Sequence, residues 1–318
     1  MKFWAVRVGS LVAALLGCLA LGAVAGRQSS FTQGLILLAG LYVTLAVSLN
    51  LINGYTGQFS LGHAGFMAVG AYTSAVITNQ FGDLSFFAAN GIFAVALLAG
   101  GLAAALAGLL VGIPSLRLRG DYLAIVTLGF GEIIRVILQN MDKVGGARGL
   151  SVMHGWANLF WTFGLAAVTV YVVASLVNST YGRGFIAVHD DEVAAEAMGI
   201  NTTKYKVTAF VIGAFFAGIA GGLYAHSKQF LTPGGFSFML SITFVVMVIL
   251  GGMGNTVGVI LAAISLTLLP EGLRQLAGYP HLGWIGDTRM IIYSLLLIVL
   301  MLTRPQGLFS LKKSFAKK

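Results

Sequence analysis

Residues 32–52 read TQGLILLAGLYVTLAVSLNLI, a stretch without a charged side chain. A helix needs about 20 predominantly apolar residues to cross the hydrocarbon core of a bilayer, and this stretch has that length. Its apolar residues follow one another without the polar alternation of a membrane barrel strand, which favours a helix. Because only helices and closed barrels satisfy their backbone hydrogen bonds in lipid, the stretch predicts a transmembrane helix.

Similar runs recur along the whole chain of 318 residues, of which 58% are hydrophobic and 9% charged. A soluble domain carries about 25% charged residues, so a large soluble domain is excluded. The runs predict an all-α polytopic membrane protein, a bundle of about ten (eight to ten) transmembrane helices in a single domain over residues 1–318. The expected crossings lie near residues 8–26, 32–52, 64–80, 90–113, 121–140, 155–177, 206–226, 238–253, 256–270 and 289–303. The shortest, at 64–80, 238–253 and 256–270, are candidates for tilted, broken or re-entrant segments.

The formal net charge of +9 comes from basic residues that are scattered near the predicted helix ends. Such scattering fits the excess of Lys and Arg on the cytoplasmic side of membrane proteins better than it fits a nucleic-acid interface. With the N-terminus inside, the cytoplasmic side carries clearly more basic residues than the outer side. We therefore expect both termini in the cytoplasm, an even number of crossings, and a basic cytoplasmic tail at residues 304–318.

The N-terminus combines Lys2 and Arg7 with an apolar stretch, a pattern that cleavable signal peptides share. We expect residues 1–26 to remain as an uncleaved first helix, because the count of crossings works best when they are retained. Cys18 is the only cysteine, which excludes an intrachain disulfide framework. The sequence lacks a His/Cys cluster with metal-ligand spacing and therefore predicts no metal site.

The apolar run at residues 32–52 leads into SLNLINGYTGQFSLGHAG at residues 48–65, which is rich in glycine and in uncharged hydrogen-bonding side chains. Glycines weaken a continuous helix, and irregular backbone at membrane depth is tolerated where it lines protein or a watery cavity. Transporters use such breaks to expose backbone groups to solute. A cytoplasmic turn with two helix caps explains the segment equally well. The candidate residues for a translocation path or hinge are Asn50, Asn53, Gly54, Gly57, Gln58, Ser60, Gly62 and His63.

Titratable side chains are rare inside the predicted crossings. For His63 we favour a structural hydrogen bond over a proton relay, the more common role of a lone histidine near a helix start. Glu132 and Arg135 are three residues apart and so lie on one helix face. Charges inside a membrane usually pair with each other, and we expect an intramembrane ion pair that fixes packing rather than a site for a zwitterion.

Small residues form two further patterns. Two predicted crossings carry a glycine or alanine at every fourth position, which favours close helix packing rather than chemistry. The positions are Ala96, Gly100, Ala104, Gly108 and Gly112 in one crossing, and Ala209, Gly213, Ala217 and Gly221 in the other. A fainter counterpart of the polar stretch, GGMGNT at residues 251–256, is consistent with an internal repeat.

Residues 178–205 form the longest predicted cytoplasmic connector. Asp190 is a good helix N-cap, Asp191 and Glu192 suit the first turn, and Gly199 suits a left-handed C-terminal cap. The pattern predicts a two-turn helix near residues 190–199. Such a helix is too short to be stable alone, so it needs a partner surface or packing against its own bundle.

This connector resembles the coupling helix of ABC importer permeases, which has the pattern Glu-Ala-Ala, three residues, then Gly. The chain has Ala194, Ala195 and Gly199 in register, with the glutamate one position early at Glu192. More specific resemblances lie at NLINGYTGQFSLGHAGF (50–66), RGDYLAIVTLG (119–129), GGARGL (145–150), the connector itself and RPQGLF (304–309). From about residue 35 to 310 the chain resembles the LivM-type permeases of branched-chain amino acid ABC importers.

The resemblance implies a permease subunit that moves leucine, isoleucine and valine across the bacterial inner membrane by alternating access. It implies no catalytic residues and no cofactor of its own, since ATP is bound by partner chains. The implied partners are a second, LivH-like permease, two ATPase subunits, a periplasmic solute-binding protein and membrane lipid, but no nucleic acid. The implied ATPase-coupling residues are Asp190, Asp191, Glu192, Ala194, Ala195, Glu196 and Gly199.

Other functions remain to be weighed against this one. Related permeases carry urea, amides or other small organic solutes. A proton- or sodium-coupled secondary transporter would explain the bundle and His63 but not the connector. A membrane enzyme has no support, because the sequence offers no paired carboxylates or nucleophile with a base. The chain also lacks a Walker-type phosphate loop, so ATP hydrolysis must lie on other chains.

Overall fold

The computed structural model describes residues 29–82, 85–115 and 121–276, together with residues 291, 294, 295, 298, 299, 302 and 307. The long helices are α2 (Ser30–Asn50), α3 (His63–Thr78), α4 (Phe86–Ser115), α5 (Asp121–Gln139), α6 (Leu159–Val177), α9 (Thr202–Lys228), α10 (Phe238–Gly251) and α11 (Thr256–Leu276). The shorter elements are η1 (Leu51–Tyr55), η2 (Asp142–Val144), η3 (Gly146–Arg148), β1 (Leu150–Ser151), α7 (Thr180–Asp190), α8 (Glu192–Ala197), β2 (Phe230–Leu231) and η4 (Pro233–Phe236). The two strands pair antiparallel.

Seven of the described helical segments are long and apolar enough to cross a membrane. The eight crossings predicted between residues 32 and 270 each coincide with a described helix. Of the helices at these eight crossings, α3 has 16 residues and is shorter than each of the seven segments that are long enough to cross a membrane. The helix predicted at 1–26 lies outside the described residues, and only scattered residues of 289–318 are described. The all-α fold is confirmed, and the total of eight to ten crossings stays a prediction.

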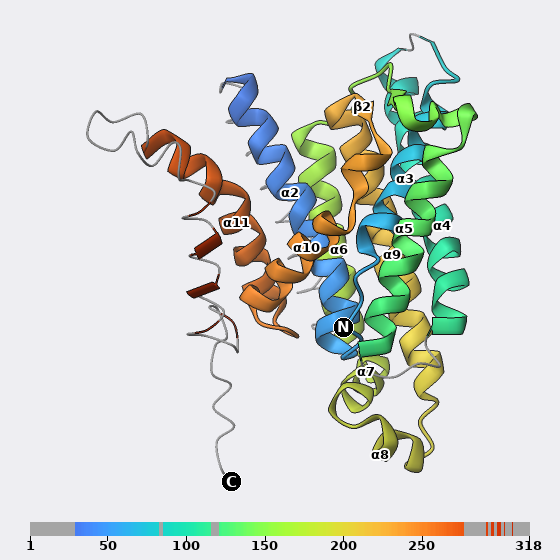
Figure 1. Cartoon of the computed structure of the whole chain (residues 1–318), viewed down its shortest axis with the longest axis vertical. Helices are drawn as coiled ribbons and strands as arrows, with labels where there is room; N and C mark the ends of the chain where they lie inside the picture. The colour runs from blue at the N-terminus through green and yellow to red at the C-terminus, as the bar shows by residue number, and fades with distance from the viewer. Residues whose placement is uncertain are drawn as a thin grey trace.

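Helices α3, α4 and α9 pack against one another (Figure 1), and glycines lie at their contacts. A Cβ at Gly100 would lie 2.8 Å from the carbonyl oxygen of Gly70, and a Cβ at Gly108 would lie 2.6 Å from the Cβ of Ala214. Both distances are shorter than van der Waals contact. Because lipid supplies no hydrophobic force between helices, such close approach is what holds them together.

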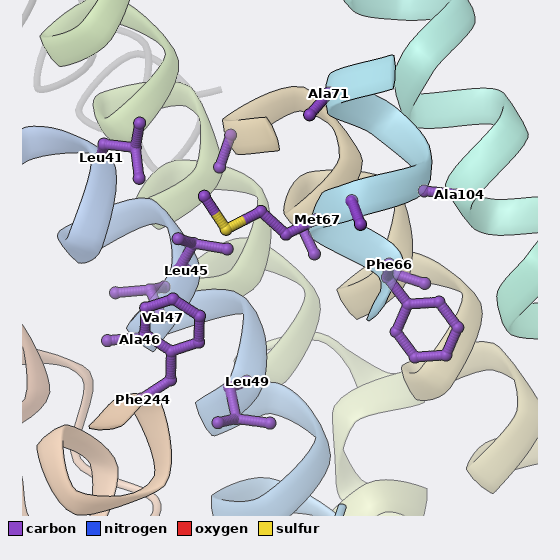
Figure 2. Close-up of a cluster of buried hydrophobic side chains, with 14 of the residues drawn as sticks. Leu41, Leu45, Ala46, Val47, Leu49, Phe66, Met67, Ala71, Ala104 and Phe244 are labelled. Atoms are coloured by element: carbon purple, nitrogen blue, oxygen red, sulfur yellow. The ribbon is translucent and has the colours of Figure 1, made fainter. Parts of the chain in front are cut away.

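The second half of α2 runs through the interior of the bundle, where almost all residues from Ala39 to Asn50 are buried. There α2 contacts α6, α9, α10 and α11. Figure 2 shows Leu45 of α2 near Met67 of α3 and Phe244 of α10, all three of them fully buried. This position of α2 places the residues that follow it inside the protein.

The connector predicted at residues 178–205 holds two short helices, α7 and α8, which project from one end of the bundle (Figure 1). The sequence predicted only one. α7 begins after Ser179, whose side chain accepts a hydrogen bond from the backbone of Gly182. Glycines lower the helix propensity of α7 and so hid it from prediction. Buried Phe185 packs edge-to-face on Tyr205 of α9, with 5.8 Å between ring centroids, and supplies the missing stabilisation.

The helix that was predicted to start after an Asp190 cap starts one residue later. Asp190 is the last residue of α7, and Asp191 is the N-cap of α8. The carboxylate of Asp191 accepts hydrogen bonds from the backbone N–H groups of Val193 (2.9 Å) and Ala194 (3.0 Å). The prediction was wrong because adjacent aspartates are equally good caps, and the extended backbone of Asp191 (φ −158°, ψ 110°) decides between them.

Candidate functional site

The residues after α2, 50–63, are called the polar segment from here on. α2 passes directly into the π-helix η1, residues 56–62 are not helical, and α3 then begins at His63. Thr56 Oγ1 donates a hydrogen bond to the carbonyl oxygen of Ile52 (2.7 Å), and Gly57 adopts the left-handed region at φ +66°. π-Helical turns are rare and are frequent at functional sites. The polar segment is thus a helix break inside the bundle.

The polar segment lies against the second glycine-rich stretch, residues 251–256. The amide nitrogen of Gly254 donates a hydrogen bond to Asn50 Oδ1 (3.0 Å), and the hydroxyls of Tyr55 and Thr256 are 2.8 Å apart. A Cβ at Gly54 would overlap both Asn50 Oδ1 and the Gly254 nitrogen. The two stretches that the sequence analysis described separately therefore form one contact, which requires glycine at its centre.

Several buried polar atoms of the segment have no hydrogen-bond partner among the described residues. Each belongs to a residue that the sequence analysis named as a path candidate. Buried polar groups are nearly always paired, and leaving one unpaired costs about 1–3 kcal/mol. The atoms are Asn50 Nδ2, Asn53 Nδ2, Gln58 Oε1, Ser60 Oγ and His63 Nδ1. The segment therefore holds both donors and acceptors that could bind water or a polar solute.

His63 makes a structural hydrogen bond to α2. Its Nε2 lies 2.9 Å from Ser48 Oγ, and that hydroxyl donates to the carbonyl oxygen of Leu45 (2.9 Å). The neighbouring backbone is held by other helices, through Leu61 N–H to Thr127 Oγ1 of α5 (3.0 Å). A Cβ at Gly62 would lie 2.5 Å from the carbonyl oxygen of Thr127, so α5 approaches the segment closely.

Glu132 and Arg135 contact each other on α5. Arg135 Nε donates to Glu132 Oε2 at 2.6 Å, and both side chains are about 30% exposed, at 30% and 28%. Their charges thus neutralise each other on the flank of the bundle. Paired in this way, they leave little net charge for a solute.

α8 presents one face to the protein and another to its surroundings. Ala195 is buried, with 4% exposure, whereas Val193 and Met198 are 62% and 82% exposed. Gly199 closes the helix in the left-handed region at φ +82°, and its N–H donates to the carbonyl oxygen of Glu196 (2.9 Å). Val193 and the C-cap residue Met198 therefore expose apolar surface at this end of the bundle.

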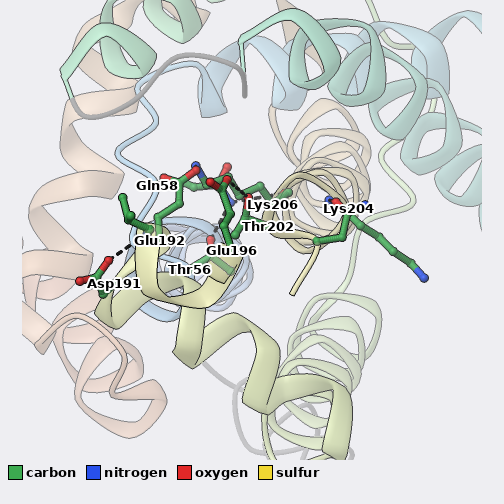
Figure 3. A network of polar contacts seen from close by, with 10 residues as sticks. Thr56, Gln58, Asp191, Glu192, Glu196, Thr202, Lys204 and Lys206 are labelled. Carbon is green, nitrogen blue, oxygen red and sulfur yellow. Dashed lines mark hydrogen bonds and ion pairs between the residues drawn. The ribbon is translucent and has the colours of Figure 1, made fainter. Parts of the chain in front are cut away.

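The connector and the polar segment meet at Lys206 near the start of α9 (Figure 3). The Lys206 ammonium lies 2.5 Å from Glu192 Oε1 of α8. Gln58 of the polar segment donates through Nε2 to the carbonyl oxygen of Lys206 (3.4 Å) and to Thr56 Oγ1 (2.7 Å). Sequence reasoning did not single out Lys206. The sequence feature that could have identified Lys206 is a charged residue at the start of an otherwise apolar crossing.

A family model described as "Branched-chain amino acid transport system / permease component" matches residues 31–301. The chain belongs to this family. It is 35% identical to the high-affinity branched-chain amino acid transport system permease protein LivM of Salmonella typhimurium, over 86% of this chain and 68% of that protein. The LivM of Escherichia coli K12 is also 35% identical, over 89% and 71%. The probable LivM of Methanocaldococcus jannaschii is 25% identical, over 86% and 92%.

Family membership confirms the resemblance to the LivM-type permeases. The permease is a multi-pass membrane protein and a transport component, not an enzyme. Among the residues that the structure describes, no group of three or more His, Cys, Asp or Glu side chains could hold a metal ion.

The permease also has a cavity of about 270 Å³ between the start of α2 and the end of α9, at the opposite end of the bundle from α8. The sequence analysis did not predict it, because its residues are spread over two helices. An ammonium and hydroxyl groups share the cavity with apolar side chains. The lining residues are Ser30, Phe31, Gly34, Leu35, Leu38, Leu41, Tyr224, Ser227 and Lys228.

Proposed function

We propose that the permease is the transmembrane subunit of an ATP-binding-cassette importer that moves leucine, isoleucine and valine across the bacterial inner membrane by alternating access. Its membership of the family and its 35% identity to LivM proteins support the solute. The single structural observation that carries the mechanism is the contact between an exposed short helix, α8, and the buried polar segment through Lys206. That contact offers a route from a motor outside the bundle to its interior.

In this proposal α8 docks on an ATPase subunit at the cytoplasmic face, where both termini also lie. A helix of six residues is not stable alone, yet α8 is capped at both ends and exposes Val193 and Met198 to its surroundings. Exposed apolar side chains at such a site are typical of a protein interface. Ala195 supports α8 from inside, so docking is assigned to the outward face.

The polar segment lines the translocation route and acts as its hinge. An amino acid zwitterion needs acceptors for its ammonium and donors for its carboxylate. The unpartnered atoms supply both, with amide nitrogens at Asn50 and Asn53 and an acceptor oxygen at Gln58. They carry no fixed charge, so they can bind the solute weakly enough to release it. The left-handed Gly57 and the π-helical turn are positions where the backbone can change conformation.

The other chains of the proposed assembly are a second, LivH-like permease, two ATPase subunits that bind ATP, and a periplasmic solute-binding protein. ATP-driven closure of the ATPases would move α8, and the bundle would open its route on the other side of the membrane. A ligand or nucleotide shifts the equilibrium between the inward-open and outward-open states only by the difference between its affinities for the two states.

Uptake by the complete complex in proteoliposomes tests the proposal. With solute-loaded binding protein outside and ATP inside, radiolabelled leucine, isoleucine and valine should accumulate, and omission of the ATPase subunits should abolish accumulation. Accumulation of urea or amides without leucine uptake would identify urea or amides as the solute in place of branched-chain amino acids. Uptake by the permease chains alone, driven by a proton or sodium gradient, would identify a secondary transporter instead.

A further inference from the structure

Lys206 is a charged side chain inside the protein, with 6% of its side chain exposed. A buried charge is costly unless a partner neutralises it. The partner is Glu192, the first residue of α8, whose side chain is 23% exposed and whose Oε1 lies 2.5 Å from the ammonium. The ion pair therefore joins the start of α9 to the start of α8.

The backbone of the same lysine joins α9 to the polar segment. Its carbonyl oxygen accepts the hydrogen bond from Gln58 Nε2, and the same amide nitrogen reaches Thr56 Oγ1. Thr56 in turn donates to the carbonyl oxygen of Ile52 within the π-helix. Figure 3 shows these side chains converging between α8 and α9, whereas Lys204 points away from them. Lys206 thus contacts the connector through its side chain and the hinge through its main chain.

Contacts other than those of Lys206 also hold α8 in place. Asp191 caps the helix, and Thr202 Oγ1 donates to Glu196 Oε1 at 2.8 Å. Phe185 of the preceding helix also packs on Tyr205 of α9. A change at Lys206 is therefore expected to leave the connector folded, with the Thr202–Glu196 hydrogen bond in place, while it removes the ion pair between Glu192 of α8 and Lys206 of α9.

We propose that Lys206 is a positioning residue that makes α8 and the first turns of α9 move as one body, so that movement of α8 reaches the polar segment. This proposal rests on the proposed function, because it requires α8 to dock on an ATPase subunit. The Glu192–Lys206 pair transmits displacement, and the Gln58 hydrogen bond delivers it to the helix break. Loss of the pair uncouples ATP hydrolysis from transport without preventing assembly.

The test compares Lys206→Met and Glu192→Gln with the wild type in the complete complex in proteoliposomes. Lys204→Met is the matched control, since Lys204 is exposed and lies in the same part of α9. Three quantities are measured: co-purified ATPase subunits, ATP hydrolysis stimulated by loaded binding protein, and solute imported per ATP. We expect both pair variants to keep the first two and to lose at least about fivefold in the third, a typical size for coupling between distant sites.

The double variant Glu192→Gln/Lys206→Met should lose no more than Lys206→Met alone, because the two residues act as a unit. Should Lys206→Met fail to accumulate, Glu192→Gln provides the same measurement at a more exposed position. An unchanged import-to-ATP ratio in the pair variants overturns the proposal. Loss of the ATPase subunits from the pair variants also overturns it, because the pair would then serve docking. Failure of the wild-type permease to bind ATPase subunits would instead disprove the proposed function.

Discussion

Asn50 Oδ1 accepts a hydrogen bond from the backbone N–H of Gly254, 204 residues later in the chain. The bond fastens the end of α2 to the turn between α10 and α11. Gly54 lies one helical turn after Asn50 and leaves no room for a Cβ at this contact. The break in α2 is therefore held in place by packing as well as by its own sequence.

Gly54→Ala should destabilise the permease by about 1–3 kcal/mol, the usual cost of forcing an extra methyl group into a packed interior. Thermal unfolding in detergent measures the effect as a lower midpoint temperature. Gly91→Ala is the matched control, because a Cβ at Gly91 meets nothing within 4 Å. This control should unfold at or above the wild-type temperature, since alanine favours a helix. Equal midpoints for the two variants would show that the contact at Gly254 is not tight.

Cysteines placed in the polar segment should become accessible to water during transport. In a Cys18→Ser background, Asn53→Cys and Ser60→Cys replace residues that are 4% and 0% exposed. If the segment lines the route, a water-soluble thiol reagent should label them on the order of tenfold faster during ATP turnover than at rest, because turnover populates the open state. Ala71→Cys, at a core position with 0% exposure, is the control and should stay protected. Protection of both Asn53→Cys and Ser60→Cys in every state would exclude a lining role.

Met198→Asp should weaken binding of the ATPase subunits, because Met198 is 82% exposed on the outward face of α8. Burying a methionine side chain is worth about 1.5–3 kcal/mol, so affinity should fall by about tenfold to a hundredfold. Co-purification at graded ATPase concentrations measures the change. Thr203→Asp, at an exposed position in the first turn of α9, should bind as the wild type does. Normal binding by Met198→Asp would place the docking surface elsewhere.

Asp191→Ala should cost about 1 kcal/mol of local stability in α8, because it removes the N-cap. Hydrogen exchange at the amides of Val193 and Ala194, which donate to the Asp191 carboxylate, should quicken accordingly. Asp191→Asn retains an acceptor and should preserve most of the protection. The comparison variant is Asp190→Ala, which should leave these amides unchanged. Faster exchange in Asp190→Ala than in Asp191→Ala would mean that the cap is misassigned.

The eight crossings predicted between residues 32 and 270 agree with described helices because hydropathy is a local property. A long apolar run in lipid has one way to satisfy its backbone, and that argument needs no knowledge of neighbouring segments. α7 escaped prediction because its glycines and its short length gave no such signal. Its stability comes from Phe185 on Tyr205, a contact between separate elements. The sequence also could not decide between Asp190 and Asp191 as the N-cap, because the two side chains have equal propensity for that position.

Local chemistry along the chain was sufficient to find the membrane helices between residues 30 and 276, the break after α2, the short helix of the connector and the family. It could not show that the break and the connector touch. Lys206 meets Glu192, and Gln58 meets the backbone of Lys206, because α9 begins beside both α8 and the polar segment. Such contacts depend on how the helices pack against one another, and small-residue interfaces between apolar helices set that packing. The tertiary structure therefore shows that two motifs that are separate in the sequence, the polar segment and the connector, are in contact through Lys206.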